Sequence, residues 1–99
     1  MTKLVYEYSI DKNQRLIDER SISFEEVVAA LDNGQLLDVI EHPNRNKYPN
    51  QKMYVLWVND YVYLIPFVEK DEQTVLLKTI FPSRKAKKQY MKNEVRDES

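Results

Sequence analysis

The residues best suited to chemistry in this sequence are cations gathered near its C-terminal end. Between positions 78 and 92 the chain carries no acidic residue and six cations, which are Lys78, Arg84, Lys85, Lys87, Lys88 and Lys92. The rest of the chain has nine cations and sixteen acidic residues, so the formal net charge of −1 hides an uneven distribution. Such a cluster indicates an anion-binding end of the molecule, although a solvated helix face would have the same composition.

Side chains that could transfer protons lie elsewhere in the sequence. The candidates are Glu69, Tyr90 and the single histidine, His42, because carboxylates, phenols and imidazoles serve as general acids and bases. Each also has a structural interpretation. His42 could be a hydrogen-bonding residue of its loop, Glu69 a cross-strand partner of a lysine, and Tyr90 an anchor of the last helix.

Composition excludes several kinds of site. The chain has no cysteine and one histidine, so we expect no disulfide and no metal centre, and one glycine cannot form a glycine-rich phosphate loop. We expect no cofactor. No apolar run reaches membrane-spanning length and no signal-peptide pattern precedes the first charged residues, so we expect a cytoplasmic protein. The length of 99 residues predicts one domain over 1–93, followed by a flexible tail over 94–99.

The elements that must position these residues centre on a strand meander over 52–81. Asn59 and Asp60 both tolerate positive φ, so they predict a two-residue turn that fixes the pairing of strands 52–58 and 61–69. The predicted partners are Val58 with Tyr61, Leu56 with Tyr63, Tyr54 with Ile65 and Lys52 with Phe67. A second hairpin through 70–73 is expected to pair Glu69 with Thr74, although Pro66 makes a bulge plausible there.

Because side chains alternate along strands, this pairing sorts them onto two faces. The Trp57 face is almost wholly apolar: Met53, Val55, Trp57, Val62, Leu64, Val68, Val75, Leu77, Thr79 and Phe81. The Tyr54 face mixes tyrosines with charged residues: Lys52, Tyr54, Leu56, Val58, Tyr61, Tyr63, Ile65, Phe67, Glu69, Leu76, Lys78 and Ile80. The Tyr54 face is either a second packing layer or a surface that holds a partner or substrate.

Two helices are predicted before the meander. The first begins at an N-cap, Asp11, and should turn Leu16 and Ile17 inward. The second begins with a capping box of Ser23 and Glu26 and ends at 33–34. Its apolar stripe, which we expect to cover the Trp57 face, consists of Phe24, Val27, Val28 and Leu31.

The remaining segments complete the fold prediction. Residues 3–8 could form an edge strand, 36–40 a strand or further core packing, and 41–51 a loop. Ser83 should cap a short basic helix, with Ala86 and Tyr90 turned inward. The sequence therefore predicts an α+β fold, with a mainly antiparallel sheet, two N-terminal helices packed on one face and a short basic C-terminal helix.

Three short motifs carry a resemblance to a known family. They are an S-F-E-E helix start at 23–26, an E-K pair at 69–70, and an S-R-K-A helix start at 83–86 followed by Tyr90. Over roughly residues 10 to 92, and in this order, the chain resembles the toxins of the BrnT family. The matching stretches of that family are an I-S-F-E-E helix start, a strand ending in an E-R-type pair, and an S-[AF]-R-K-A-type junction with a later Tyr.

The resemblance implies a small cytoplasmic ribonuclease with a RelE-like fold that inhibits translation. It also implies a cognate antitoxin with a ribbon-helix-helix type DNA-binding domain. Cleavage of RNA through its own 2′-hydroxyl needs a base, an acid and cations, but no metal ion. On this hypothesis the catalytic residues are Arg84, Lys85, Glu69, His42 and Tyr90. The residues that would bind RNA or its phosphates are Lys78, Lys87, Lys88, Tyr54 and Tyr63.

Two other function classes remain open on the sequence alone. The first is a non-catalytic module that holds a protein partner on the Tyr54 face. The second is a nucleic-acid binder without chemistry, whose affinity would fall steeply with salt. A homo-oligomer is compatible with all three.

Overall fold

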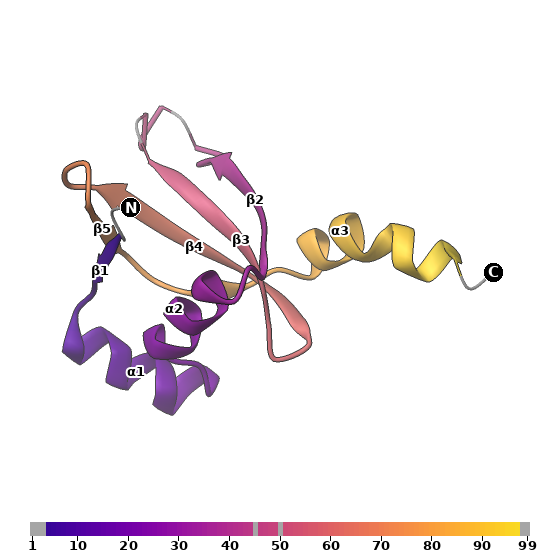
Figure 1. Ribbon diagram of the computed structural model, residues 1–99, viewed down its shortest axis with the longest axis horizontal. Helices are drawn as coiled ribbons and strands as arrows, with labels where there is room; N and C mark the ends of the chain where they lie inside the picture. The colour runs from indigo at the N-terminus through magenta and orange to yellow at the C-terminus, as the bar shows by residue number, and fades with distance from the viewer. Residues whose placement is uncertain (1–3, 45, 50, 98–99) are drawn as a thin grey trace.

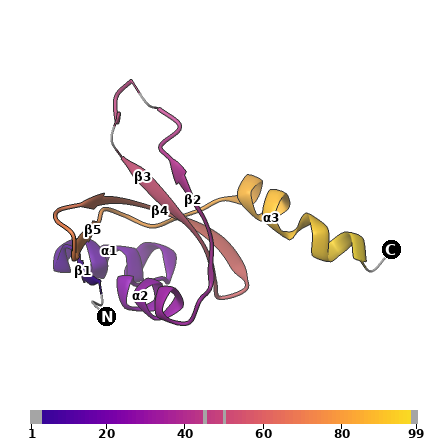
Figure 2. The same cartoon turned by 45° about the horizontal axis from the view of Figure 1, so that its top comes forward.

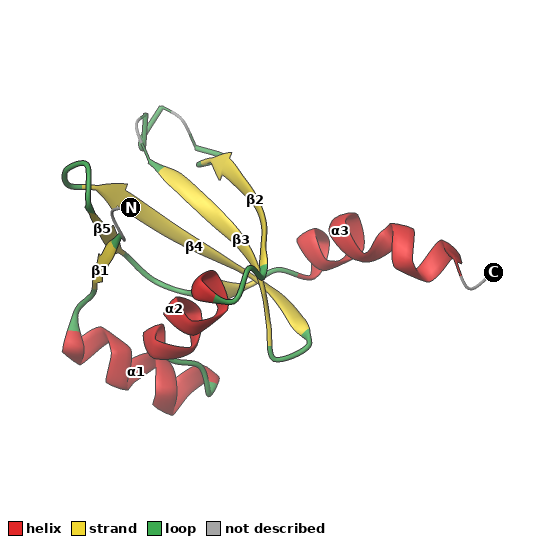
Figure 3. Ribbon diagram, viewed as in Figure 1, coloured by secondary structure: helices red, strands yellow, loops and turns green. Residues whose placement is uncertain are grey.

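The computed structural model describes residues 4–44, 46–49 and 51–97. In chain order the elements are β1 (Val5–Glu7), α1 (Ile10–Arg20), α2 (Phe24–Asp32), β2 (Leu36–Glu41), β3 (Lys52–Val58), β4 (Tyr61–Glu69), β5 (Thr74–Leu77), β6 (Phe81–Pro82) and α3 (Arg84–Asp97). The sheet has the strand order β1-β5-β4-β3-β2, and β6 pairs with β4. Only β1 and β5 are parallel among these pairs, so the predicted α+β class with a mainly antiparallel sheet is confirmed (Figures 1 and 3).

The hairpin of β3 and β4 forms as the sequence predicts. Asn59 and Asp60 have φ of 53° and 63°, the left-handed values that a tight two-residue turn requires. This turn sets the pairing of Val58 with Tyr61 and, at the far end, of Lys52 with Phe67. The expected edge strand and the strand at 36–40 also form, as β1 and β2.

The predicted pairing of the second hairpin is wrong by one residue. Glu69 lies opposite Val75 rather than Thr74, and Phe67 lies opposite Leu77. The turn is closed by Asp71, whose carboxylate accepts hydrogen bonds of 2.8 Å from the N–H groups at positions 73 and 74. The pairing of β5 with β4 stops before Pro66, which has no N–H to donate. Strand β6 then pairs with β4, with Leu64 opposite Phe81, in a register shifted by one more residue.

This shift moves the side chains of β5 to the other face of the sheet. The predicted placement of the helices is wrong as well, independently of this shift. Helices α1 and α2 cover the Tyr54 face, not the Trp57 face (Figure 2). The core beneath them consists of Leu16, Ile22, Phe24, Val27, Ala30, Tyr54, Leu56, Val58, Ile65, Phe67, Val75, Leu77 and Ile80. The Trp57 face is covered at one end by α3, through Ala86 packed on Val55 and Val62.

Helix α1 begins two residues earlier than predicted. Its N-cap is Ser9, whose hydroxyl accepts a hydrogen bond from the N–H of Lys12, and Asp11 lies inside the first turn. Leu16 is buried as expected, whereas Ile17 is 40% exposed. The prediction that both side chains point inward is therefore confirmed for Leu16 and wrong for Ile17.

Helix α2 has the predicted capping box. The Ser23 hydroxyl accepts from the N–H of Glu26, and the Glu26 carboxylate accepts from the N–H of Ser23. Phe24 and Val27 are fully buried, so the start of the apolar stripe is the main contact of α2 with the core. The chain leaves α2 through Gly34, which has a φ of 75°.

Helix α3 continues past position 93, where a flexible tail was expected. It is helical to Asp97 and points away from the sheet (Figure 1), while 98–99 lie outside the described residues. Flexibility of 94–99 therefore stays a prediction. Within the described residues, no helix combines the length and the apolar character needed to cross a membrane.

Candidate functional site

The basic cluster begins where the chain leaves the sheet and enters α3. The N–H of Ser83 donates to the carbonyl of Val62 at 3.0 Å, which ties this junction to β4. The Ser83 hydroxyl accepts from the N–H of Ala86 at 3.0 Å, so Ser83 caps α3 as predicted. The first turns of α3 are therefore held at the end of the sheet that carries the Asn59–Asp60 turn.

The cations of these turns face outward. Arg84, Lys85 and Lys88 are exposed, and no ion pair joins them to a carboxylate in the part of the chain that the structure describes. Cations near a helix N-terminus are unfavourable because the helix dipole is positive there. An anion from outside the chain would relieve this repulsion, and the backbone N–H groups of the first turn would add donors to it. The side chain of Lys92 lies outside the described part.

Two tyrosines of β4 lie near the start of α3, Tyr61 through Lys87 and Tyr63 through its pairing with Pro82. Lys87 places its ammonium 4.8 Å from the ring centre of Tyr61, and the rings of Tyr61 and Tyr63 meet edge to face at 5.8 Å. Both tyrosines are half-buried. Burial raises the pKa of Tyr63, helped by the charges of Glu26 and Tyr61, so its hydroxyl keeps its proton at neutral pH. Tyr61 was not among the predicted site residues.

Tyr90 also lies on α3, but its contacts are those of a structural residue. Its hydroxyl donates to the Asp38 carboxylate on β2 at 2.8 Å, and its ring packs on the Trp57 face. This hydrogen bond, followed by burial and the charge of Asp38, raises the pKa of Tyr90. The geometry agrees with an anchor that holds α3 across the sheet and leaves no free phenol for proton transfer.

His42 and Glu69 are not brought to the basic cluster. Glu69 ends β4, six residues beyond Tyr63, and a strand of that length spans about 20 Å. His42 follows β2 at the same far end, since Glu41 pairs with Lys52. The expected convergence of these two residues with Arg84 is therefore wrong.

The surroundings of His42 are those of a structural residue. Its Nδ1 accepts a hydrogen bond from the N–H of Asn44 at 3.1 Å, so the neutral ring carries its proton on Nε2. Its ring packs at 4.3 Å against that of Tyr48, and its N–H donates to the carbonyl of Gln51 at 2.9 Å. These contacts organise the loop between β2 and β3.

Tyr54 and Lys78 are also separated from the cluster. Tyr54 is 7% exposed beneath the helices and stacks on Phe67 with a ring distance of 4.0 Å, so the prediction that it stacks on RNA bases is wrong. The same burial removes Tyr54 from any partner-binding surface. Lys78 is exposed, and its N–H donates to the carbonyl of Pro66, well before the junction.

What remains together is a group of cations and tyrosines at the start of α3, with Glu26 as the carboxylate that acts on Tyr63. Arg84, Lys85, Lys87 and Lys88 keep their predicted place, and Tyr61 joins Tyr63. The described residues contain no group of three or more His, Asp or Glu side chains that could hold a metal ion. No protein-family model matches the chain, and a search of curated proteins finds no significant match.

Proposed function

We propose that this chain is the toxin component of a type II toxin–antitoxin system and that it acts on RNA through the start of α3. The observation that carries the proposal is the group of exposed cations Arg84, Lys85 and Lys88 at the start of α3, where Lys87 contacts Tyr61 and Tyr61 contacts Tyr63. Phosphates bind Arg and Lys, and unstacked bases bind aromatic rings, so single-stranded RNA fits both features. The resemblance to BrnT-family toxins supports the same conclusion.

The proposed reaction is cleavage of RNA by its own 2′-hydroxyl, without a metal ion. Arg84 and Lys85 hold the phosphate and stabilise the charge that develops on it. Tyr63, which keeps its proton, is suited to donate that proton to the leaving 5′-oxygen. A cytoplasmic location and neutralisation by a ribbon-helix-helix type antitoxin complete the proposal.

Purified protein incubated with single-stranded RNA tests this function. We expect products with 2′,3′-cyclic phosphate ends that still form when EDTA is present. The Arg84→Ala, Lys85→Ala double variant should reduce their rate by about 100-fold or more, because such groups contribute several kcal/mol to the transition state. Glu69→Gln is the matched control and should leave the rate unchanged, since Glu69 lies at the other end of β4.

The position of His42 and Glu69 favours one alternative, a nucleic-acid binder without chemistry. It predicts RNA binding that weakens steeply with salt and depends on Arg84 and Lys85, but no cleavage products. Loss of cleavage in Glu69→Gln would instead contradict the proposed site, because Glu69 lies at the opposite end of β4 from the start of α3.

A further inference from the structure

A hollow lies between β1 and α2, on the side of the molecule away from α3 (Figure 1). Its volume is about 340 Å³, and its lining consists of Leu4, Tyr6, Tyr8, Glu25, Val28 and Asp32. Two aromatic rings and two carboxylates thus surround a partly apolar space. No lysine or arginine is among these lining residues.

The four polar side chains of this lining come from two segments of the chain. Tyr6 lies on β1, Tyr8 follows the end of that strand, and both line the hollow. Glu25 and Asp32 are seven residues apart on α2, which is two helical turns, so they share a face. Burial, followed by the charge of Glu25, raises the pKa of Tyr8, and burial, followed by the charge of Asp32, raises the pKa of Tyr6.

Two contacts fix side chains on the Glu25 side of the hollow. The Glu25 carboxylate accepts a 2.8 Å hydrogen bond from the buried side chain of Asn13, and this bond lowers the pKa of Glu25, which therefore stays charged at neutral pH. The Tyr8 ring stacks on Phe24 at 4.8 Å. A carboxylate and an aromatic ring are thus held in place before any ligand arrives, which reduces the entropy lost on binding.

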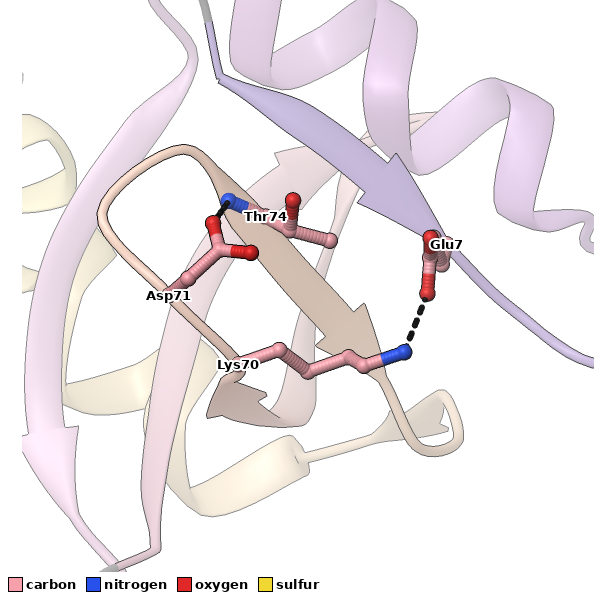
Figure 4. Close-up of polar contacts among 4 residues, drawn as sticks. All are labelled: Glu7, Lys70, Asp71 and Thr74. Atoms are coloured by element: carbon pink, nitrogen blue, oxygen red, sulfur yellow. Dashed lines mark hydrogen bonds and ion pairs between the residues drawn. The ribbon is translucent and has the colours of Figure 1, made fainter.

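The β1 strand offers a way to present a ligand to this hollow. Among the described residues it is the last strand of the sheet and pairs only with β5. An ion pair of 2.8 Å between Lys70 and Glu7 holds it to the β4–β5 turn, whose Asp71 accepts from the N–H of Thr74 (Figure 4). The free edge of such a strand accepts an extended peptide, with alternate side chains entering pockets on one face.

We propose that this hollow binds the arginine or lysine side chain of an extended segment of a partner protein. The cation would lie on the tyrosine rings, between the carboxylates of Glu25 and Asp32, while the backbone of the segment runs along β1. Cations bind the faces of aromatic rings, and a nearby carboxylate supplies the opposite charge. The inference is independent of the proposed action on RNA, which uses the other side of the molecule.

A fluorescent six-residue peptide that alternates valine with threonine and contains one arginine tests the inference. Its comparator has citrulline, the neutral isostere, at that position. Fluorescence anisotropy should show that the arginine peptide binds about 10-fold more tightly than the citrulline peptide. Asp32→Asn and Glu25→Gln should each weaken binding of the arginine peptide by about 3- to 5-fold, the range for partly exposed charge pairs.

Asp60→Asn is the matched control, because it removes one exposed carboxylate that does not line the hollow. It should leave the affinity unchanged. Asp32 is exposed, so its variant should fold even if Glu25→Gln does not. Equal affinities of the two peptides, equal losses in Asp32→Asn and Asp60→Asn, or binding of spermidine without binding of the arginine peptide would overturn the inference.

Discussion

Single side chains decide which of the chemically suited residues can act together. The cations of α3 and the cap at Ser83 could be predicted because they are consecutive in the chain and follow one local rule. The position of Tyr61 at the basic cluster could not be predicted from a local rule of this kind. Its contact with Lys87 depends on how α3 sits against β4, and no local pattern encodes that placement. His42 and Glu69 failed as catalytic candidates because both lie at the far end of the sheet.

The burial of Tyr54 predicts how the free energy of unfolding changes with pH. Burial raises its pKa above the ordinary value of 10.0, so the folded chain keeps a proton that the unfolded chain loses there. Above about pH 10 the unfolded state binds fewer protons than the folded state, and the free energy of unfolding must therefore fall as pH rises. Below that pH this contribution is fully present.

Urea unfolding between pH 8 and 11 measures this effect. The native chain should lose stability above about pH 10, and Tyr54→Phe should lose less over the same interval because it has no proton to release there. Tyr48→Phe is the control, since Tyr48 lies in the exposed loop after β2 and should follow the native chain. Identical pH profiles of the native chain and Tyr54→Phe would contradict the burial of this hydroxyl.

Whole elements were predictable where a turn residue fixes their geometry. The pair Asn59 and Asp60 dictates one register, and the helix starts follow from Ser23 and Ser83. The register of β5 was not predictable, because Asp71 closes its turn through its side chain and Pro66 interrupts the ladder. Both faces of the sheet are largely apolar, so composition alone could not decide which face α1 and α2 cover.

The contact between α1 and α2 depends on a polar residue that the sequence pattern did not single out. Asn13 is 7% exposed, and its side-chain oxygen accepts a 2.7 Å hydrogen bond from the N–H of Phe24, the first residue of α2. Its amide nitrogen donates to Glu25. Asn13→Ala would leave the buried N–H of Phe24 without its acceptor, and we expect it to lower the free energy of unfolding by about 1–3 kcal/mol.

Chemical denaturation of this variant provides the measurement. Gln14→Ala is a matched control on the same helix, because Gln14 is exposed and bonds only to the nearby Asp18 among the described contacts. It should change stability by no more than about 0.5 kcal/mol. Similar effects of the two substitutions would show that the Asn13 hydrogen bonds do not join the helices.

At the scale of the whole molecule, charged side chains are unevenly distributed. The exposed cations of α3 follow the end of the sheet, while Glu25 and Asp32 of α2 line a hollow with Tyr6 and Tyr8. Figure 1 shows α3 and β1 on opposite sides of the molecule. A near-neutral net charge therefore hides one surface suited to an anion and one suited to a cation. The proposed toxin could hold RNA and a basic protein segment without competition between them.

Growth of bacteria that express this chain alone tests the central claim most directly. Native protein should arrest growth on induction, whereas the Arg84→Ala, Lys85→Ala variant, present as soluble folded protein in the same amount, should not. The Glu69→Gln variant, expressed alone, should arrest growth like the native chain. Normal growth with soluble native protein, or equal arrest by the native chain and the double variant, would contradict a toxin that acts through the start of α3.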